Sequence, residues 1–273
     1  MENRAIGVFD SGLGGLTVVK EIMKLLPNEK IVYFGDTARV PYGSKSKKVV
    51  QKYSKEITAF LMTKNVKMVV IACNTATAMA LEEIQKTLDI PVIGVIKPGS
   101  RRACKTTVNG KIGIIGTKGT VDSDSYKKEI NLLEDKMEVF QKACPLFVPL
   151  IEEGMIDDPV TVDIASRYLK SFENQGIDTL VLGCTHYPLI KDTLKKIVKD
   201  NVILIDSAEE TAIEVRSILY NKRILRQNKG EESEFYVSDS PKKFVEVGQL
   251  FLGEALQKAE MVDIEKYSHD ENR

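Results

Sequence analysis

Hydrophobic and polar residues along this chain form short apolar blocks separated by longer amphipathic stretches. An apolar run bounded by turn residues predicts a buried strand, and such runs lie at residues 5–9, 31–34, 68–72, 92–95, 111–115, 180–182 and 202–205. Amphipathic stretches predict helices at 16–26, ending before Pro27, from Ser46 as N-cap through 64, and near 75–87, 121–135, 160–174 and 187–199. This alternation predicts an α/β fold with mostly parallel sheets covered by helices.

The chain length predicts about two domains, because domains average ~150 residues. We place the boundaries at the turns 94–98 and 206–207. The first α/β domain then comprises 1–95 plus 207–273, and the second comprises 96–206. A weak internal repeat indicates that the two domains are similar, since GVFDSGLGG at 7–15 and GIIGTKGT at 113–120 both read as strand, loop and helix.

Composition excludes several classes of protein. Lys+Arg and Asp+Glu both total 39, and the absence of a basic patch predicts no nucleic-acid partner. No apolar run approaches the ~20 residues of a membrane span, and the N-terminus shows no signal peptide. Four dispersed cysteines fit a reducing, cytoplasmic location. No CxxC pair occurs, and two histidines (His186 and His269) predict no metal site.

Two cysteines stand in nearly equivalent contexts, Cys73 in VVIACNTATA and Cys184 in LVLGCTHYPL. Each follows a predicted strand, so both thiols should lie at carboxyl ends of parallel strands, where α/β sheets bind ligands. A buried cysteine is usually only a small hydrophobe, and Cys104 and Cys144 are interpreted so. Polar residues directly after Cys73 and Cys184 favour a functional role. We expect the two thiols to meet in the interdomain cleft, one on each face of a substrate.

Glycine-rich loops at 12–15 and 113–119 raise the possibility of a dinucleotide site. The G-x-G-x-x-G pattern is incomplete, because Thr17 occupies the place of the third glycine, and no P-loop occurs. Such loops offer backbone N–H groups at helix N-termini, which bind a carboxylate as readily as a phosphate. Hydroxyl side chains stand in similar places, each of which could instead be a helix N-cap: Ser11, Thr75, Thr117, Thr120 and Thr185.

Four segments in order along the chain resemble the glutamate racemase family, which belongs to the cofactor-independent aspartate/glutamate racemase superfamily. They are DSGLGGLTV (10–18), YFGDTARVPYGSKS (33–46), ACNTATA (72–78) and GCTHYPL (183–189). The resemblance implies two α/β domains with the active site between them. It also implies interconversion of L- and D-glutamate without a cofactor, which supplies D-glutamate for peptidoglycan.

The resemblance also implies roles for individual residues. The catalytic thiols would be Cys73 and Cys184, with Asp10 assisting the first, and Glu152 and His186 assisting the second. Choosing Glu152 over its neighbour Glu153 rests on the spacing in PLIEEG. The substrate-binding residues would be Asp10, Ser11, Tyr42, Gly43, Asn74, Thr75, Thr117, Thr120, Thr185 and His186.

The chemistry of these residue types fits racemisation independently. A thiol with a free pKa of ~8.5 can be tuned toward neutrality and can then act as base or acid. His186, two residues after Cys184, can move protons near pH 7, and polar donors around the α-carboxylate would stabilise a carbanion. Open alternatives are a sister racemase acting on aspartate or a hydantoin, a nucleotide-binding oxidoreductase, and a non-catalytic carboxylate-binding module. Scattered Leu and Ile on helix surfaces lead us to expect a homodimer.

Overall fold

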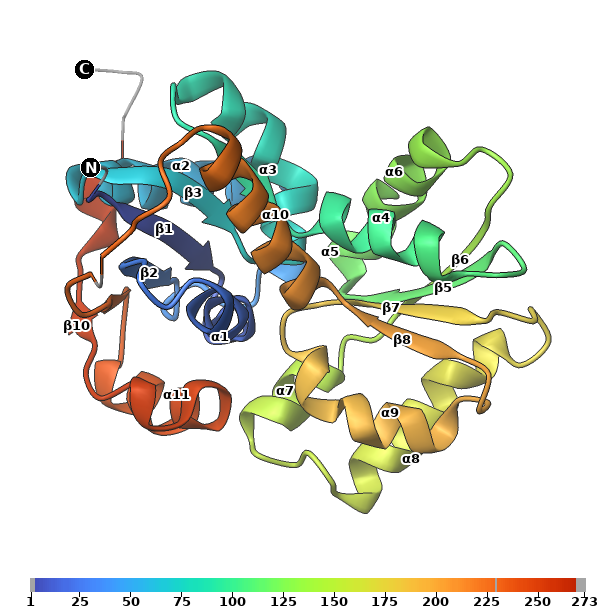
Figure 1. The fold of residues 1–273 in the computed structure, drawn as a ribbon. Coiled ribbons are helices and arrows are strands. Elements are labelled where there is room, and N and C mark those ends of the chain that lie inside the picture. The colour runs from blue at the N-terminus through green and yellow to red at the C-terminus, as the bar shows by residue number, and fades with distance from the viewer. Residues whose placement is uncertain (1–2, 229, 269–273) are drawn as a thin grey trace.

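The computed structural model describes residues 3–228 and 230–268, and its strands form two separate parallel sheets (Figure 1). The first sheet contains β1 (Ala5–Asp10), β2 (Ile31–Gly35), β3 (Val66–Ile71), β4 (Val92–Gly94), β9 (Glu234–Val237) and β10 (Glu260–Met261). The second contains β5 (Lys111–Gly116), β6 (Glu138–Ala143), β7 (Thr179–Gly183) and β8 (Ile203–Asp206). Every strand pair is parallel. The expected α/β class with parallel sheets is therefore confirmed.

The two sheets share one topology. The order β2-β1-β3-β4 in the first sheet matches β6-β5-β7-β8 in the second, and β9 and β10 extend the first sheet beyond β2. From adjacent strands β1 and β3 the chain continues toward opposite sides of the sheet, and the same holds for β5 and β7. A crevice therefore opens at the carboxyl ends of each of these strand pairs. The sequence repeat at 7–15 and 113–120 corresponds to the units that begin with β1 and β5.

Helices cover both faces of both sheets. One face of the first sheet packs against α1 (Leu16–Leu25), α10 (Ser207–Asn221) and α11 (Pro241–Leu252), and the other against α2 (Lys47–Thr63) and α3 (Asn74–Thr87). The second sheet packs against α4 (Ile96–Thr106) and α6 (Ser125–Leu133) on one face, and α7 (Phe147–Glu152), α8 (Pro159–Leu169) and α9 (Lys191–Ile197) on the other. Short elements complete the fold: α5 (Lys118–Asp122) and the 3₁₀ turns η1 (Tyr42–Ser44), η2 (Lys170–Phe172), η3 (Tyr187–Ile190), η4 (Gly253–Ala255) and η5 (Ile264–Tyr267).

Local signals account for most helix ends. The Ser46 side chain accepts a hydrogen bond from the Val49 N–H at 3.4 Å, which confirms it as the N-cap of α2. Helix α1 ends two residues before Pro27, which cannot continue a helix. The helix expected at 121–135 is divided into α5 and α6, because Asp124 adopts a left-handed conformation with φ of 55° between them.

Two expected turns are wrong in detail. Helix α4 already begins at Ile96, and Pro98 is tolerated in its first turn because no intrahelical N–H bond is needed there. At 206–207 no loop intervenes, since β8 runs directly into α10. The Asp206 side chain caps α10 by accepting from the Ala208 N–H at 2.8 Å.

Each sheet has its own hydrophobic cores, and the helices that contribute to them indicate where the chain divides into domains. Side chains of α10 belong to the core of the first sheet, whereas those of α4 belong to the core of the second. Helices α4 and α10 also pack against each other where the chain crosses between the sheets (Figure 1). This arrangement supports boundaries at 95/96 and 206/207, which stay a prediction. Residues 269–273, including His269, lie outside the described part of the chain.

Candidate active site

The first thiol lies at the carboxyl end of β3, in the crevice between β1 and β3. Cys73 is the N-cap of α3, and its Sγ accepts a hydrogen bond from the Ala76 N–H at 3.4 Å. Its thiol also donates to the Ser11 Oγ, 3.7 Å away, in the loop that follows β1. Cys73 is therefore oriented by one backbone donor and by one hydroxyl from the neighbouring strand end.

The second thiol lies at the carboxyl end of β7 in a different local setting. Cys184 is followed by the 3₁₀ turn η3, so it caps no α-helix. Its Sγ is 4.0 Å from the His186 Nδ1, and the His186 Nε2 is 2.9 Å from the Glu152 Oε1 at the end of α7. The second thiol thus has a histidine–carboxylate pair behind it, which the first thiol lacks.

Both thiols line one narrow cavity between the two sheets. Ten of the predicted site residues line it: Ser11, Tyr42, Gly43, Cys73, Asn74, Thr75, Thr117, Cys184, Thr185 and His186. The cavity volume is about 20 Å³, which is room for about one water molecule. Three predicted residues, Asp10, Thr120 and Glu152, lie behind this lining and contact it. The structure therefore brings together the site residues expected from the sequence.

Close contacts between the two domains narrow this cavity. A Cβ at Gly14 would lie 2.3 Å from the Thr185 Oγ1 and 2.4 Å from the His186 Nδ1. A Cβ at Gly43 would lie 2.7 Å from the Thr117 Cβ. Real Cβ atoms do not approach other atoms so closely, so glycine at these two positions permits the loops of one domain to touch the other.

Asp10 bridges the two domains behind the cavity. Its carboxylate is fully buried, accepts from the Gly12 N–H at 3.0 Å, and accepts from the Thr185 hydroxyl at 3.4 Å. Among the hydrogen bonds between described residues, none joins Asp10 to Cys73. Asp10 stabilises the loop after β1 but does not cap α1, whose N-cap is Gly15.

Burial and neighbouring charges make the two thiol sites electrostatically different. Burial, together with the nearby Asp10 carboxylate, raises the pKa of Cys73 to about 12. Burial lowers the pKa of His186, but its contacts with Cys184 and Glu152 outweigh this and raise it to about 10. Near neutral pH, Cys73 is therefore a thiol, and His186 is an imidazolium beside Cys184. Burial also raises the pKa of Asp10, although the His186 charge partly opposes this.

The cavity offers hydrogen-bond donors suited to a carboxylate. The Asn74 Oδ1 accepts from the Tyr126 hydroxyl at 2.7 Å, which leaves the Asn74 Nδ2 buried and without a partner among the described residues. Thr75, Thr117 and Thr120 form a triangle of hydroxyls with Oγ1–Oγ1 distances of 2.9, 3.0 and 3.3 Å. An unpaired buried amide donor is costly unless a ligand accepts from it.

Some lining residues were not predicted. Val40, Pro41 and Val148 also line the cavity. Val40 and Pro41 directly precede Tyr42 in the segment 33–46, which resembles glutamate racemases. Val148 lies four residues after Cys144, and no motif in the sequence marked it as a site residue. The Tyr42 hydroxyl donates to Asp36, so it is not a free donor for a ligand in the cavity. Tyr126, which donates to Asn74 from α6, was also not predicted.

The described part of the chain offers no second site that contains the predicted residues. A larger cavity of about 240 Å³ lies between η2 and α9 in the second domain, and it contains none of the predicted site residues. Among residues 3–228 and 230–268, no three His, Cys, Asp or Glu side chains are grouped as a metal site would require. No helix in the same part of the chain is both long and apolar enough to span a membrane.

Comparisons with known proteins match this chain to racemases over a range that includes strands of both sheets. Residues 6–215 match a protein family described as Asp/Glu/Hydantoin racemase. The chain is 52% identical to a glutamate racemase of Geobacter metallireducens, with 96% of this chain and 97% of that protein aligned. A glutamate racemase of Francisella tularensis in complex with D-glutamate superposes with a TM-score of 0.92 at 41% identity, covering 98% of this chain and 100% of that one. A Bacillus anthracis glutamate racemase isoform superposes with a TM-score of 0.92 at 42% identity, covering 96% and 97%.

Proposed function

The chain belongs to the Asp/Glu/hydantoin racemase family, and we propose that it interconverts L- and D-glutamate through two opposed thiols without a cofactor. One observation carries the proposal: Cys73 and Cys184, from equivalent strand ends of two sheets, line the same narrow cavity. Racemisation removes a proton from one face of the α-carbon and returns one to the other, which requires an acid–base group on each face. The D-glutamate would supply peptidoglycan synthesis, as the resemblance to glutamate racemases implies.

The different surroundings of the two thiols suit opposite starting protonation states. His186, held as an imidazolium by its contacts with Cys184 and Glu152, stabilises a thiolate at Cys184. Cys73 is buried near Asp10 and starts as a thiol. In this state Cys184 would remove the α-proton of L-glutamate, and Cys73 would donate a proton to the opposite face. The reverse reaction begins with the protonation states exchanged, and Asp10 then helps to take up the Cys73 proton.

The polar groups divide into two sets that fit the two carboxylates of glutamate. Asn74 and Thr185 are the direct neighbours of the two thiols in sequence, so they lie beside the α-carbon and are placed to bind the α-carboxylate. The unpartnered Asn74 Nδ2 is the donor that such a carboxylate would satisfy. Donors fixed around the α-carboxylate stabilise the charge that develops when the α-proton leaves.

The triangle of threonine hydroxyls forms the second set. It adjoins the backbone of Gly43, whose missing side chain leaves room for Thr117. We assign this group to the side-chain carboxylate of glutamate, together with the Tyr42–Gly43 backbone. Ser11, which accepts from the Cys73 thiol, completes the polar lining on the first domain.

Substrate entry requires movement of the two domains. Glutamate is several times larger than the cavity of about 20 Å³. The contacts that close the cavity join different domains, among them the hydrogen bond from the Thr17 hydroxyl to the Thr185 carbonyl at 3.1 Å. Opening would break contacts of this kind between the domains and leave each sheet and its core intact.

The proposal is tested by measuring glutamate racemisation without added cofactor, by circular dichroism, in the wild type and in Cys73→Ser and Cys184→Ser. We expect activity in the wild type and loss of most of it in each variant, with Cys104→Ser, at a thiol outside the cavity, as the control. Near-normal turnover in either cavity variant would refute the two-thiol mechanism. A panel with aspartate and a hydantoin separates glutamate racemase from its sister activities.

Assembly and location complete the proposal. We propose a homodimer, whose interface could include exposed apolar side chains such as Leu146, Tyr220 and Leu250. Light scattering during size-exclusion chromatography tests this oligomeric state.

All four cysteines are free thiols in the structure, which supports a reducing, cytoplasmic location.

A further inference from the structure

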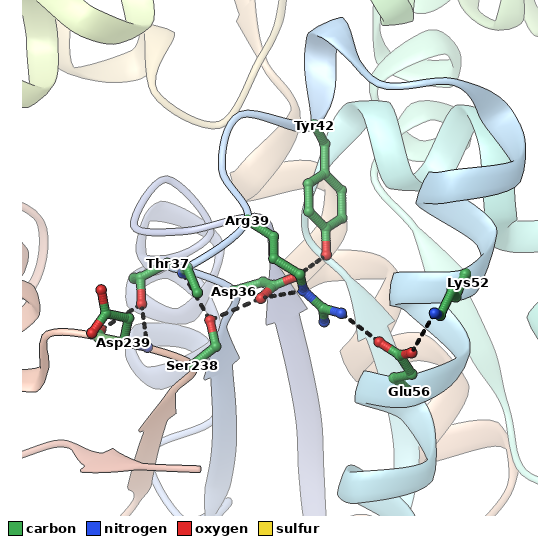
Figure 2. A network of polar contacts seen from close by, with 9 residues as sticks. Asp36, Thr37, Arg39, Tyr42, Lys52, Glu56, Ser238 and Asp239 are labelled. Atoms are coloured by element: carbon green, nitrogen blue, oxygen red, sulfur yellow. Dashed lines mark hydrogen bonds and ion pairs between the residues drawn. The ribbon is translucent and has the colours of Figure 1, made fainter. Parts of the chain in front are cut away.

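A network of polar contacts holds the loop that carries Tyr42 (Figure 2). Asp36 follows β2 and is fully buried. Its carboxylate accepts from the Tyr42 hydroxyl and from the Arg39 Nε, which lies 3.0 and 2.8 Å from its two oxygens. The Arg39 Nη1 donates in turn to Glu56 on α2. Arg39 therefore joins the loop to a rigid helix.

The same carboxylate ties the loop to the strand end after β9. The Ser238 hydroxyl donates to the Asp36 Oδ1 at 2.8 Å and accepts from the Ala38 N–H at 2.9 Å. The Thr37 hydroxyl donates to the Asp239 carbonyl at 2.5 Å. Figure 2 shows these contacts on one side of Asp36 and the Arg39–Glu56 pair on the other. The loop is thus anchored both to α2, the helix that follows it, and to the segment after β9, which is distant in sequence.

Arg39 is the residue on which this anchoring depends. Its guanidinium carbon lies 3.9 Å from the centre of the Tyr53 ring, and the Tyr42 ring packs against the same ring at 5.6 Å. The planar guanidinium binds two carboxylates at once, which the ammonium of lysine cannot do with the same geometry. Removing its charge would leave Asp36 and Glu56 buried with like charges, an arrangement that proteins avoid.

The position of this loop shapes the polar end of the cavity. Tyr42 and Gly43 line the cavity, and Gly43, which can contribute only its backbone, is in close contact with Thr117 of the second domain. Burial and the Asp36 charge raise the pKa of Tyr42 well above its ordinary value, so its hydroxyl stays a donor to Asp36. A shift of the loop would therefore move the backbone that we assign to the side-chain carboxylate.

We propose that Arg39 and Glu56 are positioning residues that act through Asp36 and Tyr42 to hold the Tyr42–Gly43 backbone against the substrate. This inference rests on the proposed function. Neither residue lines the cavity. A group that orients a substrate carboxylate contributes equally to binding the substrate and the transition state, so its loss raises KM and leaves kcat nearly unchanged.

The first test is steady-state kinetics of Arg39→Lys and Glu56→Gln with both enantiomers of glutamate. We expect KM to rise about tenfold or more, which is the cost of weakening a hydrogen bond to a charged group, with kcat changed far less. Lys52→Ala is the matched control. Lys52 contacts the same Glu56 at 3.8 Å but is 63% exposed, and exposed pairs contribute little. Unchanged KM in both variants, or an equal loss of kcat, would overturn the proposal.

The second test does not depend on activity. Without substrate, the rates at which N-ethylmaleimide modifies Cys73 and Cys144 are compared in each variant by peptide mass spectrometry. A loosened loop should expose Cys73, beside it in the cavity, while Cys144 in the core of the second domain stays protected. Equal acceleration at both thiols would indicate general unfolding and overturn a positioning role. If the wild type showed no racemase activity, the proposed function would fail, yet selective modification of Cys73 would still support the hold on the loop.

Discussion

Replacing His186 by asparagine tests the electrostatic difference between the two thiol sites. The substitution removes the imidazolium that lies 4.0 Å from the Cys184 Sγ and 2.9 Å from the Glu152 Oε1. Asparagine has a similar size and keeps a polar group, so the buried turn after β7 should be retained. The main loss is the positive charge beside the thiolate.

The size of the effect follows from the distance. Two unit charges 4 Å apart attract by about 4 kcal/mol at an effective dielectric constant of about 20. Since 1.36 kcal/mol corresponds to a factor of ten, losing this attraction corresponds to a decrease in rate of about 10³-fold. This lies within the ~10²–10⁴-fold range for losing an acid–base partner. We therefore expect kcat/KM to fall by about three orders of magnitude.

The assay measures initial rates from each enantiomer by circular dichroism. L- and D-glutamate have equal free energies, so kcat/KM must fall by the same factor in both directions, whereas kcat and KM separately can differ. Unequal factors would reveal an error in the assay. Cys104→Ser is the control for a conservative substitution outside the cavity. A decrease of less than about tenfold in a folded His186→Asn variant would refute the proposed charge pairing.

Three further predictions follow from the same geometry. In D₂O the product enantiomer should carry deuterium at the α-carbon from the first turnover while remaining substrate stays largely protonated; equal labelling of both, read by mass spectrometry, would instead indicate a single base. Asp10→Asn should lower kcat by about 10²–10⁴-fold, because the buried carboxylate near Cys73 is lost. If the variant kept the wild-type kcat, Asp10 would only stabilise the loop after β1. The pKa of His186 is raised from 6.5 to about 10 on folding. The contribution of His186 to the stability of the fold should therefore be complete below pH 6.5 and lost as the pH rises to about 10. Thermal melting should then show that the difference in melting temperature between the wild type and His186→Asn shrinks across that pH range. A difference that stays constant would contradict the raised pKa.

Local sequence signals predicted seven of the ten strands in the described part of the chain, most of its α-helices and both strand-end thiols, but they missed strands β6, β9 and β10 and helices α4, α7, α10 and α11. An apolar run is a short-range pattern, so it predicts a strand without information from the rest of the chain. The polar residues that follow two such runs then indicate that Cys73 and Cys184 lie at the ends of strands. The four segments that resemble glutamate racemases contain nine of the ten predicted residues that line the cavity, and the tenth, Thr117, lies in the glycine-rich loop at 113–119. The N-cap at Ser46 was predicted for the same reason, because a cap involves neighbours within one turn.

Contacts between residues far apart in sequence were decided only by the tertiary structure. The Asp10–Thr185 hydrogen bond, the placement of Val148 in the cavity and the bond from Ser238 to Asp36 join segments with no shared local pattern. Tyr42 shows the difference most clearly. The resemblance implied that Tyr42 belongs to the candidate site, but only the packing of its ring against Tyr53 of α2 and the position of Asp36 show that its hydroxyl donates to Asp36. Periodicity reports which face of an element is buried, whereas the partner on that face depends on how whole elements pack.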